Sequence, residues 1–190
     1  MYFEEKKGKE VELESDASME MGEGSMYQQK KFRGLPVEGK WEEVIKMCEE
    51  DITLCTIKIN EKSGTALHMA VNDEGNEDHV KRLVGIMIKF KRGEKALESK
   101  NERGDTPLHL AASRGLKSIC ECIIGENEER KDLIQIPNKE GETPLFQAAL
   151  SWQKETFMYL FGLVPVDSHE KLIRNNGDSI LHCAIRREYF

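Results

Sequence analysis

A six-residue phrase recurs four times along this chain of 190 residues. The copies open at Thr65, Thr106, Thr143 and Ser179, so they lie 41, 37 and 36 residues apart. The second copy reads Thr-Pro-Leu-His-Leu-Ala. A helix-start phrase that returns at this period is typical of a solenoid, in which each repeat buries its apolar face against its neighbours. Such a chain acts through an extended surface rather than a catalytic pocket.

The second copy shows how one repeat is predicted to fold. Thr106 suits the N-cap of a helix, because its hydroxyl can accept hydrogen bonds from the free N–H groups of the first turn. Pro107 follows at the first helical position, where a missing N–H costs nothing, and His109 can reach back to the cap from the third position. Gly115 is predicted to end this helix and Gly125 the apolar helix that follows. Each repeat is therefore predicted to be a pair of short antiparallel helices.

The third copy repeats this plan and departs from it at one position. Thr143 and Pro144 open its first helix, and Gly162 is predicted to end its second helix. This glycine follows its threonine by the same number of residues as in the second copy, so the match covers a whole unit. Phe146 stands where the other copies have histidine.

Turn residues precede each phrase. A glycine stands two positions before the opening residue in three copies, where it can adopt positive φ, and an asparagine that can cap the local backbone stands five positions before three of them. These turns are predicted to be loops that project between the repeats. The residues are Gly104, Gly141 and Gly177, and Asn60, Asn101 and Asn138.

The recurring histidines are interpreted as structural. His68, His109 and His182 occupy the same position of three copies, so they do not converge on one metal or reacting atom. His79 and His169 stand in polar surroundings and are expected to be solvated. The complete set of predicted structural residues is Thr65, His68, Gly104, Thr106, Pro107, His109, Gly115, Gly141, Thr143, Pro144, Gly177 and His182.

These residues resemble the ankyrin repeat, whose pattern is a β-turn carrying Gly-x-Thr-Pro-Leu-His-x-Ala-Ala, a glycine turn and an outer helix rich in Val, Ile and Leu. The resemblance covers about residues 30–190 and implies an all-α ankyrin-repeat solenoid of stacked helix-turn-helix units joined by β-turn loops. Residues 1–29 are predicted to form a disordered acidic leader, because they have few large apolar residues and no sustained period.

The repeats are predicted at about 30–58, 59–100, 101–137, 138–173 and 174–190. The first is expected to be degenerate, because Gly34 and Pro36 fall where its inner helix should run and proline interrupts a helix. The last is expected to be incomplete, because no outer helix follows its phrase.

A narrower likeness rests on the order of three segments, residues 39–45, 63–71 and 181–190. This order is similar to the N-terminal ankyrin region of plant accelerated-cell-death-like proteins, which carry a C-terminal transmembrane PGG domain. That resemblance implies the cytosolic part of a membrane-associated regulator of defence and stress signalling. The chain itself is expected to be cytoplasmic, with full-length relatives anchored in a membrane.

Composition and motifs argue against several classes of function. The formal net charge is −7, so the chain lacks the positive field that nucleic-acid binding requires. No apolar run approaches the roughly 20 residues that span a bilayer, so direct membrane insertion is not expected. Cys120 and Cys122 are two apart on a predicted helix and point in different directions, which does not suit a shared zinc. With no phosphate loop and no Gly-x-Ser-x-Gly or His-Glu-x-x-His motif, we expect no enzyme, no cofactor and no metal.

The sequence therefore predicts that the chain functions through a binding surface. In the ankyrin fold, the turn tips and the exposed side of the inner helices line a concave groove that binds protein partners. Arginine and tryptophan are over-represented among interface hot spots. The candidate partner-binding residues are Arg103, Arg114, Lys139 and Trp152. Two alternatives stay open: the repeats are the regulatory arm of an enzyme or channel encoded downstream, or the chain is a truncated product without independent function.

Overall fold

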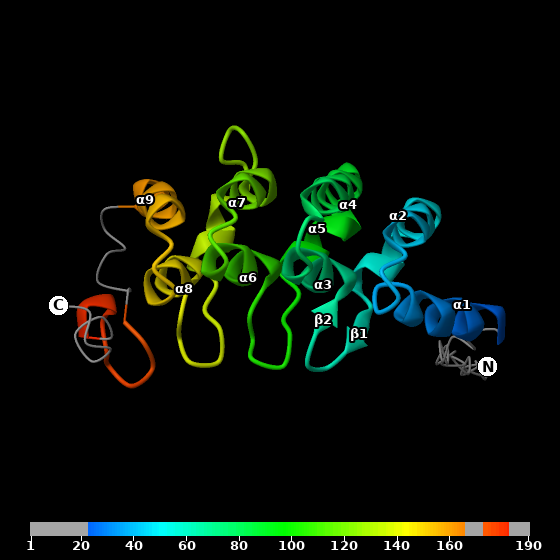
Figure 1. The fold of residues 1–190 in the computed structure, drawn as a ribbon, viewed down its shortest axis with the longest axis horizontal. Helices are drawn as coiled ribbons and strands as arrows, with labels where there is room; N and C mark the ends of the chain where they lie inside the picture. Colours follow the sequence, from blue (N-terminus) through cyan, green and yellow to red (C-terminus); the bar gives the residue numbers. More distant parts are fainter. Residues whose placement is uncertain (1–22, 166–172, 183–190) are drawn as a thin grey trace, which may run out of the picture.

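Two layers of helices and a row of loops run along the molecule (Figure 1). The computed structural model describes residues 23–165 and 173–182. Inner and outer helices alternate along the chain, and the last three inner helices pack side by side, while the first contacts β1. The inner helices are α1 (Glu23–Gly34), α3 (Ala66–Asn72), α6 (Pro107–Ser113) and α8 (Pro144–Leu150). The outer helices are α2 (Trp41–Glu50), α4 (Glu77–Lys89), α7 (Lys117–Ile124) and α9 (Lys154–Leu163). The predicted all-α solenoid of stacked helix pairs is confirmed.

Short elements connect these pairs. The strands β1 (Lys58–Asn60) and β2 (Gly64–Thr65) form an antiparallel hairpin in which Lys58 lies opposite Thr65 and Asn60 opposite Gly64. The additional helix α5 (Lys91–Leu97) follows α4. The 3-10 helices η1 (Ile52–Thr56) and η2 (Lys131–Gln135) lead from α2 and α7 toward the next repeat. The apolar core is one continuous cluster that extends from Phe32 to Leu160.

The recurring threonine and histidine form the predicted cap. Both the N–H and the hydroxyl of Thr106 contact His109 Nδ1, at 3.1 and 2.8 Å, and a capping box opens α6. Because Nδ1 accepts from the backbone N–H, the ring proton lies on Nε2, which is 3.0 Å from the carbonyl oxygen of Glu142 in the next repeat. His68 bonds to the carbonyl oxygen of Asp105 in the same way, at 3.0 Å. Each buried histidine therefore joins two neighbouring repeats.

The fourth copy of the phrase has the same local bonds in a different environment. The N–H and hydroxyl of Ser179 contact His182 Nδ1 at 3.2 and 2.8 Å. An isolated bridge joins Ile173 to Ser179, as the β1–β2 hairpin joins the strands of an earlier repeat. Leu181 and His182 are exposed. The cap is thus determined by local sequence and does not depend on burial.

The first repeat differs from its prediction. α1 begins at Glu23, inside the segment predicted to be a disordered leader, and ends at Gly34. Pro36 is buried in the turn that follows, so neither residue interrupts an inner helix. The inner helix lies earlier in the sequence because Gly39, two residues before α2, takes the left-handed turn position with φ 71°.

Two further predictions were wrong. Gly162 does not end the second helix of its repeat: it lies inside α9, which continues to Leu163, whereas Gly125 has φ 96° and does end α7. His79 is half-buried rather than simply solvated, since its Nδ1 lies 2.9 Å from Asn76 Oδ1 and its Nε2 lies 3.4 Å from Glu42 Oε1. His169 lies outside the described residues.

Candidate functional site

The loops that open the repeats form one edge of the molecule. Figure 1 shows them projecting from the inner helices, on the side away from the outer helices. Beside them, the same position of three successive inner helices is partly exposed. We call these loops and helix positions the inner face. It comprises residues 60–63, 101–104, 138–141 and 174–177 together with Met69, Leu110 and Gln147.

Backbone hydrogen bonds join the three loops at residues 101–104, 138–141 and 174–177 to one another. The N–H of Lys139 donates to the carbonyl oxygen of Arg103 at 3.1 Å, and the N–H of Asn175 donates to that of Glu140 at 3.0 Å. The loops approach so closely that a Cβ added at Gly104, whose φ is 81°, would lie 2.7 Å from the Lys139 nitrogen. The tips are therefore held as a continuous row rather than as independent loops.

Buried polar side chains support this row from beneath. Asn138 Nδ2 donates to Asp105 Oδ1 at 2.7 Å. The amide oxygen of Asn138 accepts from the N–H groups of Glu140 and Glu142, both at 3.0 Å. Asp105, Asn138 and Glu142 are all buried. Because buried polar groups without partners are costly, this set fixes the loop conformation, and the exposed tips are left available for contacts outside the chain.

The departure at Phe146 is matched by a different connection to the next repeat. Phenylalanine has no ring nitrogen, so it cannot bond to a carbonyl as His68 and His109 do. Instead, Arg174 of the following loop lies 2.6 Å from the buried carboxylate of Glu142, and its guanidinium carbon is 5.9 Å from the centre of the Phe146 ring. Gln147 also donates to Glu142. A charged pair and a cation–π contact thus replace the histidine bond at this junction.

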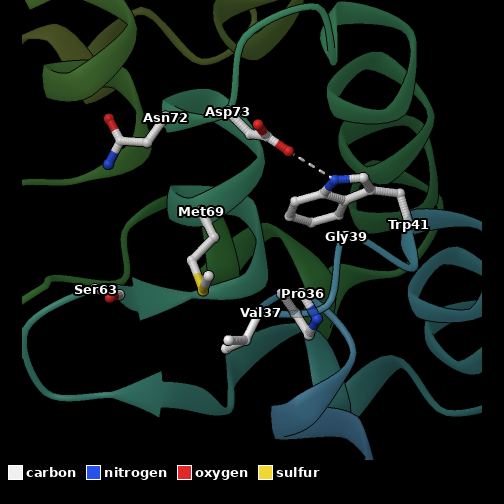
Figure 2. Close-up of a pocket in the computed structure, with 8 residues that line it drawn as sticks. All are labelled: Pro36, Val37, Gly39, Trp41, Ser63, Met69, Asn72 and Asp73. Atoms are coloured by element: carbon white, nitrogen blue, oxygen red, sulfur yellow. Dashed lines mark hydrogen bonds between the residues drawn. The ribbon is translucent and has the colours of Figure 1, made fainter.

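A pocket of about 360 Å³ opens at the N-terminal end of the inner face (Figure 2). Trp41 is 5% exposed, and its indole N–H donates to Asp73 Oδ2 at 3.0 Å. Asp73 is the one charged residue among those that line the pocket. The lining residues come from the α1–α2 turn, the start of α2, the β1–β2 loop and the end of α3; they are Pro36, Val37, Gly39, Trp41, Ser63, Met69, Asn72 and Asp73.

Comparison with known proteins agrees with this architecture. The family described as "Ankyrin repeats (3 copies)" matches residues 41–133 and 67–167. This chain belongs to the ankyrin-repeat family. It is 33% identical over 96 residues to the ANK repeat-containing protein nipk-1 of Caenorhabditis elegans, which covers 48% of this chain and only 16% of the nematode protein. Ankyrin repeats are a non-catalytic fold that mediates protein–protein interactions.

The ankyrin architecture separates the four predicted partner-binding residues into two pairs. Arg103 and Lys139 lie on neighbouring loop tips, and both are exposed. Arg114 and Trp152 lie at the other end of the inner helices, in the turns α6–α7 and α8–α9. An inner helix of seven residues is about 10 Å long. One small ligand therefore cannot contact all four residues, whereas a protein surface can.

Two of these residues form ion pairs within the repeats, and a third has a strained backbone. Arg103 lies 3.6 Å from Asp105 Oδ2, and Arg114 lies 3.7 Å from Glu74 Oε1. Trp152 occupies the left-handed turn position, with φ 59°, two residues before the outer helix. Gly39 and Gly115 fill this position in other repeats. Trp152 is nevertheless 56% exposed, and a bulky residue with positive φ is strained by about 1–2 kcal/mol.

The titratable groups of the repeats are not poised for chemistry. Burial lowers the pKa of His68 and of His109 to about 4, so both rings are neutral near pH 7. Burial also raises the pKa of the Cys120 thiol to about 12, which makes it a weak nucleophile. Within residues 23–165 and 173–182, no three His, Cys, Asp or Glu side chains gather in a way that could hold a metal ion. In the same part of the chain, every helix is too short or too polar to cross a membrane.

Sequence reasoning missed the pocket beside Trp41. Trp41 is buried, as expected of an apolar residue that packs in the core. Its hydrogen-bond partner Asp73 is 32 residues away along the chain, and no local pattern links the two. The usable signal was Gly39, because a left-handed glycine two residues before an outer helix indicates that residues 36–37 belong to the turn between the two helices of the repeat.

Proposed function

We propose that this ankyrin solenoid binds a protein partner through the inner face. The observation that carries the proposal is the row of linked loop tips, in which the hydrogen bonds that hold the loops use backbone and buried groups. The side chains of Arg103 and Lys139 are left exposed at adjacent tips. A rigid surface loses little conformational entropy on binding, which favours affinity and specificity.

The second pair of candidates extends this surface toward the outer helices. Arg114 and Trp152 lie in the inner-to-outer turns, one repeat apart. Tryptophan and arginine are the side chains that most often dominate interface energies. The strained backbone at Trp152 supports a role there, since strain concentrates at functional positions. We propose that a partner spans both pairs.

Site-specific photo-crosslinking tests the proposal. A benzophenone amino acid placed at Arg103 or Lys139 should crosslink the same partner from an extract of the source cells. The same group at Met158, an exposed position of the outer helix α9, should not. The Arg103→Ala, Lys139→Ala double variant should then bind the purified partner at least tenfold more weakly. Capture through Met158 alone would place the binding surface on the outer helices and contradict the proposal.

We further propose that the module is the cytosolic part of a plant membrane-associated regulator of defence and stress signalling. The support is the order of residues 39–45, 63–71 and 181–190, which is similar to the ankyrin region of the plant PGG-domain proteins. The coding sequence downstream of Phe190 tests it. Several apolar segments of about 20 residues would support membrane anchoring, whereas an outer helix followed by a polar stop would contradict it.

A further inference from the structure

We propose that the pocket beside Trp41 binds an arginine side chain of the partner. This inference rests on the proposed function, because it assigns one contact within the inner face. The pocket has two chemically different parts. Met69 and Val37 form an apolar part beside the indole of Trp41, and the carboxylate of Asp73 points toward the indole nitrogen (Figure 2). A ligand that fills it needs an aliphatic stem and a polar end.

The charge at the rim selects a cation. Asp73 Oδ2 accepts from the Trp41 indole at 3.0 Å and also from Asn76 Nδ2. Asp73 Oδ1 has no hydrogen-bond partner among the described residues. The carboxylate is thus held in place with one oxygen available at the mouth of the pocket. Because it is the one charged group in the lining, an incoming cation meets no competing positive charge there.

Three cations on the neighbouring elements form ion pairs that do not include Asp73. Lys40 lies 2.7 Å from Glu38, and Arg82 lies 2.6 Å from Glu42. Arg114 lies toward Glu74, at 3.7 Å. None of these pairs involves Asp73. The formal net charge of −7 adds a long-range field that favours approach of a basic partner.

Arginine suits this pocket better than other side chains. Its methylene stem can lie against apolar surface while its charged end stays at the rim. Val37 is 66% exposed and would be covered by such a stem. The planar guanidinium presents several N–H donors in a fixed fork, which suits the carboxylate of Asp73.

The indole N–H of Trp41 provides a direct readout. The chain has two tryptophans, so its nitrogen-15 spectrum contains two indole signals, and Trp152→Phe identifies the one from Trp41. The full 190-residue chain would be titrated at low salt with acetyl-Leu-Arg-Leu-amide. The matched probe replaces arginine by citrulline, which has the same shape without the charge. We expect a saturable shift of the Trp41 signal and about tenfold tighter binding of the arginine peptide.

Two substitutions locate the effect. Asp73→Asn retains an acceptor for the indole and should remove the preference for arginine over citrulline. Glu74→Gln removes the same charge from the next residue, which is 93% exposed and lies outside the pocket lining, and should leave the preference intact. Val37→Ser, at an exposed turn position, should weaken both peptides alike. Unchanged thermal unfolding of each variant shows that the fold is retained.

Several results would overturn the inference. The citrulline peptide could bind as tightly as the arginine peptide, or Glu74→Gln could remove the preference for arginine as fully as Asp73→Asn does. A lysine peptide could bind more tightly than the arginine peptide, or the peptide could shift only the NMR signals of the loop tips. Arg103→Ala should leave tripeptide binding unchanged, because Arg103 is not among the lining residues. If the arginine tripeptide does not bind but photo-crosslinking at Arg103 captures a partner, only this inference is contradicted. If the tripeptide binds but crosslinking at Arg103 captures no partner, the proposed binding surface is contradicted instead.

Discussion

Mild acid should destabilise this solenoid through its two buried histidines. The folded pKa of His68 and of His109 is about 4, against an ordinary value of 6.5, chiefly because both rings are buried. Between these values the unfolded chain binds more protons than the folded chain. Stability is therefore complete above pH 6.5 and is lost progressively as the pH falls from 6.5 toward 4.

The expected loss follows from the size of the shift. A pKa lowered by about 2.5 reduces the free energy of unfolding by about 3 kcal/mol per histidine once the pH is below 4. Between pH 7 and pH 5, the same relation gives a loss of stability of about 2 kcal/mol for each ring and about 4 kcal/mol for the two together. Domains of this size are stable by about 5–15 kcal/mol, so the change is a large part of the total.

Urea unfolding followed by circular dichroism at several pH values measures this loss. His109→Phe is the informative variant, because Phe146 fills the same position of the next repeat. It should be less stable than the natural chain at pH 7 and should lose about half as much stability on acidification, about 2 kcal/mol by pH 5. Asp105, which lies near both rings, is kept in all variants.

A second variant controls for the other histidines and carboxylates. His79→Gln removes a half-exposed histidine on an outer helix and serves as the comparison for the loss of a histidine outside the buried pair. If His109→Phe lost as much stability as the natural chain between pH 7 and pH 5, the histidines would not be the source of the acid sensitivity. The reasoning from burial to pKa would then be refuted.

Three further substitutions test the repeat architecture by the same unfolding assay. Gly115→Ala should cost at least about 1 kcal/mol, because its φ is 74° and the new Cβ would lie 2.2 Å from Gln153 Oε1; equal stability would contradict the strained turn. Thr106→Ala should cost about 1 kcal/mol through the lost cap, and no loss would question the capping box. Arg174→Met should cost about 3 kcal/mol, because it leaves the carboxylate of Glu142 buried and unpaired, and an effect below 1 kcal/mol would contradict this.

The features that sequence predicted correctly are those set by residues close together in the chain. Thr106, Pro107 and His109 stand within one helical turn, so their types alone determine the cap. Gly115 takes positive φ because side chains avoid that conformation, which is a property of the residue and its position.

The features that sequence missed depend on contacts between residues far apart in the chain, or on how the first and fourth repeats align with the others. The bond from Trp41 to Asp73 joins two repeats, and the pairing of Arg174 with Glu142 joins two others. A correct prediction of the position of α1 required recognising Gly39 as the glycine of the turn before the outer helix. Trp152 could have been found by aligning it with Gly115, since both lie nine residues after the threonine that opens their repeat.

The histidine bond between repeats has a consequence for how such a chain can change over evolutionary time. His68 and His109 each bond to a main-chain carbonyl, which every amino acid possesses. A duplicated or transplanted repeat therefore meets a compatible neighbour whatever residue supplies that carbonyl. The junction between Glu142 and Arg174 requires two particular side chains. The histidine bond thus places no requirement on the side chain of the neighbouring repeat, whereas Glu142 and Arg174 must be inherited together to keep their ion pair.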